Sequence, residues 1–159
     1  MAHPYGERND LDNLLGDLLV AQLLDLNKDG AEDAGVYDAV REEADAEIDS
    51  CLGQKYVVPF NRTTAPTVPD IIRVISNYLS AALLLAKRHQ SAEQVTFYAG
   101  RATRLIEQIQ QGKKTVIYAD GEEAALVDSS SAAIGLHYTS GTPVFGGVDD
   151  DGNDRMSGW

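Results

Sequence analysis

The chain has 159 residues, of which 43% are hydrophobic, and this length and composition are typical of one folded domain and exclude a wholly disordered polypeptide. Its formal net charge of −12 argues against tight DNA binding, because duplex affinity depends on lysines and arginines that neutralise phosphates. A single cysteine excludes a disulfide within the chain, and no export signal is evident, so we expect a protein of a reducing cytoplasm. The nearly apolar run 78–86 is too short to cross a bilayer, so we expect no membrane partner.

Two amphipathic helices are expected in the N-terminal third. Asn9 or Asp10 suits the cap of the first, which would run to about residue 25 with leucines at helical spacing. A polar loop separates it from a second helix over 33–52. The expected buried stripe of this second helix comprises Tyr37, Val40, Ala44, Ile48, Cys51 and Leu52. Gly53 suits the position just past its end.

Two further helices follow a proline-rich loop. Pro69 is favourable in the first turn of a third helix. The apolar face of this helix is unusually wide, so we expect it to be the central, most buried one. That face comprises Ile71, Ile72, Ile75, Tyr78, Leu79, Ala82, Leu83, Leu84, Leu85 and Ala86. Ser91 and Gln94 form a Ser-x-x-Gln capping-box pattern before a fourth helix, which Gly112 ends. The four helices predict a compact bundle.

The character of the chain changes beyond residue 114. Residues 115–118 are strand-like and Asp120-Gly121 suits a hairpin turn, although the returning arm 122–127 would equally suit a helical turn. The remaining residues are rich in Ser, Gly and Asp, with isolated apolar side chains. These are Tyr138, Val144, Phe145, Met156 and Trp159. Such an arm cannot pack a core alone, so it orders against a partner or is a disordered tail. We therefore expect a helical bundle domain, 1–114, followed by a hairpin and extended C-terminal arm, 115–159.

Charge changes sign twice along the chain. Residues 1–50 hold 14 acidic and three basic side chains. Residues 51–118 hold three acidic and nine basic side chains, and residues 119–159 hold eight acidic and one basic. The net charges are −11, +6 and −7. The basic middle would face the acidic ends of the same subunit or those of a neighbour in a ring; an ordinary solvated surface is the alternative. We expect Arg101 and Arg104 to pair with the acidic second helix in preference to phosphate.

Candidate metal and catalytic residues are few. Asp25–Gly30 matches the first six positions of an EF-hand loop and Asp33 matches the ninth, but Val36 stands where a bidentate carboxylate is required. We therefore expect a polar loop without calcium. Cys51 lies on an apolar face and the three histidines are scattered, so no nucleophile, base or ligand set converges. The sequence predicts no cofactor and no enzymatic activity.

The order of these features resembles the small head–tail adaptor (connector) proteins of tailed bacteriophages, of the Mu-like type. An Ile-Asp-x-x-Leu pattern ends the second helix, Tyr56-x-x-Pro59 follows, and the proline loop leads to two helices and a terminating glycine. The positions that carry the resemblance are Ala44, Ile48, Leu52, Tyr56, Pro59, Ile75, Tyr78, Leu79, Tyr98, Ala102, Leu105, Ile109 and Gly112.

This resemblance implies a mainly α, non-enzymatic virion protein at the head–tail junction. Related adaptors form a ring, usually of twelve copies, below the portal protein; double-stranded DNA passes through the ring without specific binding, and a tail-side stopper or tail-completion protein docks on the other face. The C-terminal arm would contact the portal through its apolar side chains. An acidic regulatory module, such as an anti-repressor or DNA mimic, is the alternative, favoured by the charge of residues 1–50. A calcium-responsive domain is a third interpretation.

Overall fold

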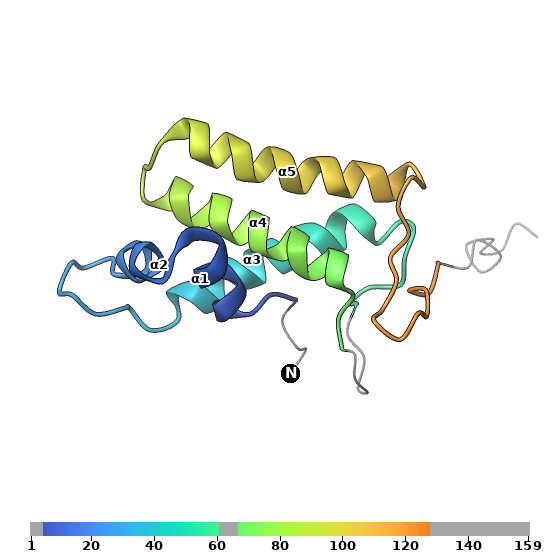
Figure 1. Cartoon of the computed structure of the whole chain (residues 1–159), viewed down its shortest axis with the longest axis horizontal. Helices are drawn as coiled ribbons and strands as arrows, with labels where there is room; N and C mark the ends of the chain where they lie inside the picture. The colour runs from blue at the N-terminus through green and yellow to red at the C-terminus, as the bar shows by residue number, and fades with distance from the viewer. Residues whose placement is uncertain (1–4, 61–66, 128–159) are drawn as a thin grey trace, which may run out of the picture. The chain divides into compact units, whose positions relative to one another are not determined.

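The computed structural model of the chain describes residues 5–60 and 67–127, and these residues are mainly helical (Figure 1). The helices are α1 (Arg8–Leu15), α2 (Asp17–Leu24), α3 (Val36–Leu52), α4 (Asp70–Lys87) and α5 (Ala92–Gln110). None of the described residues belongs to a β-strand. All of the described residues belong to one compact unit of the chain, which ends at Val127.

The first expected helix is in fact two helices, α1 and α2, which meet at Gly16. This residue has a φ of 91° and a ψ of 135°, a conformation that glycine adopts easily and other residues rarely. The Gly16 N–H donates to the carbonyl of Asp12 at 2.8 Å, which closes α1, and the Val20 N–H donates to the carbonyl of Gly16 at 3.0 Å, which opens α2. The prediction of one helix reaching residue 25 is therefore wrong.

Helix α3 begins at Val36, three residues later than expected. The Asp33 carboxylate accepts N–H groups of the preceding loop, from Leu26 at 2.5 Å and Asn27 at 3.2 Å, so this residue belongs to the loop. The expected buried stripe is confirmed in its main part. Its fully buried members are Val40, Ala44, Ile48 and Leu52, whereas Tyr37 and Cys51 are half-buried. The backbone of Gly53 has a right-handed helical conformation, not a left-handed one. Glycine is nevertheless required here, because a Cβ would lie 2.7 Å from the Asp49 carbonyl oxygen.

Helix α4 is the central helix, as predicted, and it packs against α1, α2, α3 and α5. Two buried apolar clusters meet on it. The first includes Ala44, Ile48, Leu52, Tyr56, Phe60, Ile72, Ile75, Leu79, Ala102, Ile106 and Ile109. The second includes Leu11, Val20, Leu23, Leu24, Val40, Ala81, Leu84 and Leu85. Ala86, expected in the buried face, is exposed, and Ser76 and Ser80 are buried instead. The Ser76 hydroxyl donates to Asp45 Oδ1 at 2.7 Å, which satisfies it inside the core.

Helix α5 has the expected extent but not the expected cap. Ser91 occupies the N-cap position without a side-chain hydrogen bond, so the capping box is not formed. Gly112, with a φ of 72°, ends the helix, and its N–H donates to the carbonyl of Ile109 at 3.0 Å. The N–H of Lys113 donates to the carbonyl of Gln108 at 2.8 Å, so the last turn of α5 is closed by backbone bonds as the sequence predicted.

Residues 115–127 pack against the first apolar cluster and carry isolated antiparallel bridges. The bridges join Tyr56 to Leu126 and Ile117 to Glu123. The buried side chains of this segment belong to the first apolar cluster; they are Val116, Tyr118 and Ala124. The predicted β-hairpin is therefore represented among the described residues by isolated bridges, not by paired strands.

Candidate functional site

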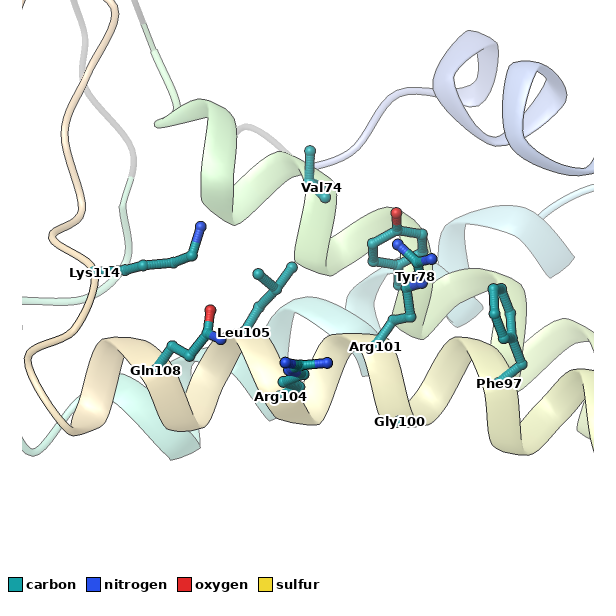
Figure 2. A pocket seen from close by; sticks show the side chains of 9 residues that line it. All are labelled: Val74, Tyr78, Phe97, Gly100, Arg101, Arg104, Leu105, Gln108 and Lys114. Carbon is teal, nitrogen blue, oxygen red and sulfur yellow. The ribbon is translucent and has the colours of Figure 1, made fainter.

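A groove of about 700 Å³ lies between α4 and α5, and Figure 2 shows side chains from both helices and from the segment beyond α5 around it. We call it the α4–α5 groove. Its lining residues are Val74, Tyr78, Phe97, Gly100, Arg101, Arg104, Leu105, Gln108 and Lys114. Three of them carry a positive charge and none carries a negative charge, so the groove favours an anionic occupant.

The positive charge of the groove is carried by three exposed side chains. Arg101, Arg104 and Lys114 are exposed, and none of them forms an ion pair with another residue in the described ranges. The prediction that the two arginines pair with the acidic helix expected over 33–52, which is α3 in the structure, is therefore wrong. The residue that pairs with α3 is Lys87, whose Nζ lies 2.7 Å from Glu43 Oε2. The sequence could not show this, because the rotation of α5 about its axis is set by tertiary packing.

The groove also has an apolar component. Phe97 is 51% exposed, and the guanidinium carbon of Arg101 lies 5.1 Å from its ring centroid. Tyr78 of α4 stacks on Tyr98 of α5, with ring centroids 6.2 Å apart, which joins the two walls. At Gly100 a Cβ would meet no atom within 4 Å, so this position leaves open space in the middle of α5. A glycine in a helix interior costs about 0.5–1 kcal/mol relative to alanine, and nothing in the described structure offsets it.

The exposed face of α3 is the acidic counterpart of this groove. We call it the α3 ridge, and it consists of Ala39, Glu42, Glu43, Ala46, Glu47 and Ser50. These residues recur at three- and four-residue spacing, so they share one face of the helix. Glu43 is paired with Lys87, whereas Glu42 and Glu47 form no ion pair with any described residue. Small side chains separate the glutamates, which makes the ridge narrow.

The comparison with protein families identifies this chain at the family level. A family model described as bacteriophage Mu, Gp36 matches residues 5–133. The chain belongs to the bacteriophage Mu Gp36 family. A comparison with curated proteins found no match. The matched region includes the five helices of the described residues, the α4–α5 groove and the α3 ridge, and membership indicates a phage protein with a structural or assembly role.

In this Gp36-family chain the inner side of α3 holds the N-terminal segment. Asp45 accepts hydrogen bonds from the Tyr5 N–H at 3.0 Å and from the Ser76 hydroxyl, and the Tyr5 hydroxyl donates to Asp49. Burial raises the pKa of Asp45 and the pKa of Asp49, and it also raises the pKa of Tyr5, which the hydrogen bond to Asp49 raises further. These carboxylates are occupied by structural partners.

The residues that carry the sequence resemblance have structural positions in this Gp36-family fold. Ile48, Leu52 and Tyr56 are buried in the first apolar cluster. The peptide bond between Val58 and Pro59 is cis, and Gly112 ends α5. The side chains of Tyr78 and Tyr98 are half-buried. The predicted portal-contacting residues Tyr138, Val144, Phe145, Met156 and Trp159 lie outside the described residues. Sequence reasoning missed the groove, although Phe97 and Gly100 on the polar side of α5 were the available signals.

The EF-hand-like loop of this family member is held by its own hydrogen bonds. Asp25 accepts the N–H of Asp29 at 3.2 Å and that of Gly30 at 3.0 Å. Within residues 5–60 and 67–127, no cluster of three or more His, Cys, Asp or Glu side chains is placed to bind a metal ion. Across the same ranges, no helix has the length and hydropathy that crossing a membrane requires.

Proposed function

We propose that this protein is a head–tail adaptor of a tailed bacteriophage. Copies of the chain form a ring below the portal protein, as related adaptors do, usually with twelve copies. Packaged DNA passes through this ring. A tail-side stopper or tail-completion protein docks on its other face. The observation that carries the proposal is the Gp36-family match over residues 5–133. The resemblance to adaptors in the sequence, from Ala44 to Gly112, falls inside the same region.

The charge of the chain supports a channel-forming role. A net charge of −12 repels phosphates, so DNA would slide through a ring of such subunits without specific binding. The proposal contains no catalytic step and no cofactor. Its chemistry is that of assembly, in which complementary surfaces join one copy to the next and join the ring to larger machines.

We place the portal contact in the C-terminal arm on the basis of its sequence. Apolar side chains spaced within a Ser-, Gly- and Asp-rich segment suit addition to the surface of a partner, because backbone pairing and a few apolar anchors supply the binding energy. These side chains are Tyr138, Val144, Phe145, Met156 and Trp159.

Deletion of residues 140–159 tests this assignment. Binding to purified portal protein, measured by co-sedimentation, should be abolished, while circular dichroism still shows the helical content of the full chain. A matched control replaces Asp149, Asp150 and Asp151 with asparagine, which leaves the apolar side chains in place and should preserve binding. Undiminished portal binding by the deletion variant would contradict the role of the arm.

The alternative, an acidic module that occupies one basic partner, is favoured by the −11 charge of residues 1–50. It predicts a complex of fixed, low stoichiometry without ring symmetry, and absence of the protein from mature particles. Mass spectrometry of purified virions separates the two. Detection at several copies per portal supports the adaptor, and absence from the particles contradicts it.

A further inference from the structure

We infer that the α4–α5 groove of one copy binds the α3 ridge of the neighbouring copy, head to tail. The inference rests on the proposed function, since it names the contact that builds the ring. The occupant of the groove is therefore a second copy of this chain, which the placement, the charge and the shape of the two surfaces support.

The two surfaces lie on opposite sides of the subunit. Helix α4 uses Ser76 and Lys87 to contact α3, whereas Val74 and Tyr78 of the same helix line the groove. At about 100° per residue, the first pair lies roughly half a turn around α4 from the second pair. Figure 1 shows α3 passing behind α4, consistent with this separation. Two different surfaces on opposite sides join copies in a heterologous manner, which produces a ring when the rotation closes.

The charges of the two surfaces are complementary, and apart from Glu43 they have no ion-pair partner among the described residues. The groove presents Arg101, Arg104 and Lys114 without described acidic partners, and the ridge presents Glu42 and Glu47 without described basic partners. Arginine binds carboxylates with two parallel hydrogen bonds, which favours a defined register as well as attraction. Several such contacts around a ring stabilise it together even where each is modest.

The shapes of the two surfaces also fit. Ala39, Ala46 and Ser50 keep the ridge narrow, and Gly100 leaves the wall of α5 open at the middle of the groove. A helix lying in a groove is a recurrent mode of protein recognition. The half-exposed Phe97 ring would cover the aliphatic stems of the ridge glutamates, so the apolar part of the groove is used as well.

Two charge-reversed variants of the full-length chain test the contact. Arg101→Glu with Arg104→Glu makes the groove acidic, and Glu42→Lys with Glu47→Lys makes the ridge basic. In each variant alone, the groove of one copy meets a ridge of the same charge on the next copy, so self-association should weaken at least about tenfold. An equimolar mixture should restore association, because every groove then meets a ridge of opposite charge. Association is measured by sedimentation velocity and by electron microscopy on portal protein.

Two controls separate charge and shape from general effects. Glu93→Lys with Glu123→Lys changes the net charge as much as the ridge variant does, outside both surfaces, and should leave association unchanged. Gly100→Leu fills the groove without a change in charge and should weaken association about as strongly as the charge reversals. Circular dichroism confirms that each variant keeps the helical content of the unmodified chain.

Each outcome decides the inference. Normal assembly of either charge-reversed variant alone, or failure of the mixture to recover, overturns it. Reduced DNA retention by the groove variant with unchanged association would assign the groove to DNA and also overturn it. Copies that dock on the portal singly would overturn the inference and leave the proposed function standing. Restored association in the mixture without portal binding would support the contact and contradict the proposed function.

Discussion

The hydroxyl oxygen of Tyr5 accepts a hydrogen bond from the backbone N–H of Phe60 at 2.9 Å, and the two rings meet edge to face with centroids 6.0 Å apart. Both side chains are almost fully buried. The same hydroxyl donates to Asp49 of α3. Tyr5 therefore joins the N-terminal segment, α3 and the residues that precede the proline loop, three parts of the chain that are distant in sequence.

Replacement of Tyr5 by phenylalanine should destabilise the fold. The ring contact with Phe60 would remain, but the Phe60 N–H and the Asp49 carboxylate would each lose a hydrogen bond in a buried setting, at a cost of about 1–3 kcal/mol. Urea denaturation followed by circular dichroism measures the free energy of unfolding. Tyr37→Phe is the matched control, since the Tyr37 hydroxyl forms no hydrogen bond with any residue in 5–60 or 67–127, and equal losses for both variants would refute the role of the Tyr5 hydroxyl.

Stability should decline at alkaline pH, in part through Tyr5. Burial raises the pKa of Tyr5, and its hydrogen bond to Asp49 raises that pKa further, so the folded chain keeps this proton where the unfolded chain, with a pKa of 10.0, loses it. The folded state then binds more protons, and the free energy of unfolding falls as the pH rises above 10. Burial raises the pKa of Tyr37 to about 12, which adds to the decline. Denaturation curves from pH 8 to 11 should show a shallower decline for Tyr5→Phe, and identical slopes would contradict this.

The same change, glycine to alanine, should have opposite effects at two positions. At Gly53 a Cβ would lie 2.7 Å from the Asp49 carbonyl oxygen and 3.3 Å from Val58 Cγ2, so Gly53→Ala should destabilise the fold by about 1–3 kcal/mol. At Gly100 the space is open and the residue is inside α5, so Gly100→Ala should stabilise it by about 0.5–1 kcal/mol. Thermal and urea denaturation of the two variants provide the measurement, and shifts of the same sign would disprove the packing argument.

Arg88 should control the stability of α2. Its Nε donates to the carbonyl of Leu23 and its Nη2 donates to the carbonyl of Gln22, both at 2.8 Å, at the end of that helix. Arg88→Ala removes both bonds, and amide hydrogen exchange should accelerate several-fold in residues 17–24 while α5 keeps its protection. Replacing the exposed Arg104 with alanine is the control and should leave exchange in α2 unchanged. Uniform acceleration in all helices would instead indicate global destabilisation.

Most of the helical layout was predictable because it depends on local signals. The apolar stripe of α3 and the wide apolar face of α4 follow the helical period, and Pro69 and Gly112 mark boundaries by their backbone preferences. Gly16 was missed because leucines continue at helical spacing on both sides of it. The helical spacing of apolar residues does not show that a single residue turns the chain between two short helices.

The candidate site was less predictable than the fold, because it depends on tertiary placement. The spacing of Arg101 and Arg104 shows that they share a face of α5, but which neighbour that face meets is decided by the packing of α5 on α4. Phe97 and Gly100 lie outside the face of α5 that carries its buried residues Ala102, Ile106 and Ile109, so helical spacing does not single them out. Only the structure brings these residues together in one groove and places Glu42 and Glu47 of α3 across the subunit from it.

Electron microscopy of the full-length protein mixed with the portal protein of the same phage tests the central claim most directly. The account predicts class averages in which a ring of adaptor density is coaxial with the portal, with one adaptor copy for each portal subunit. Portal rings that remain bare at saturating adaptor concentration, or that carry adaptor density without rotational symmetry, would contradict the assignment as a head–tail adaptor.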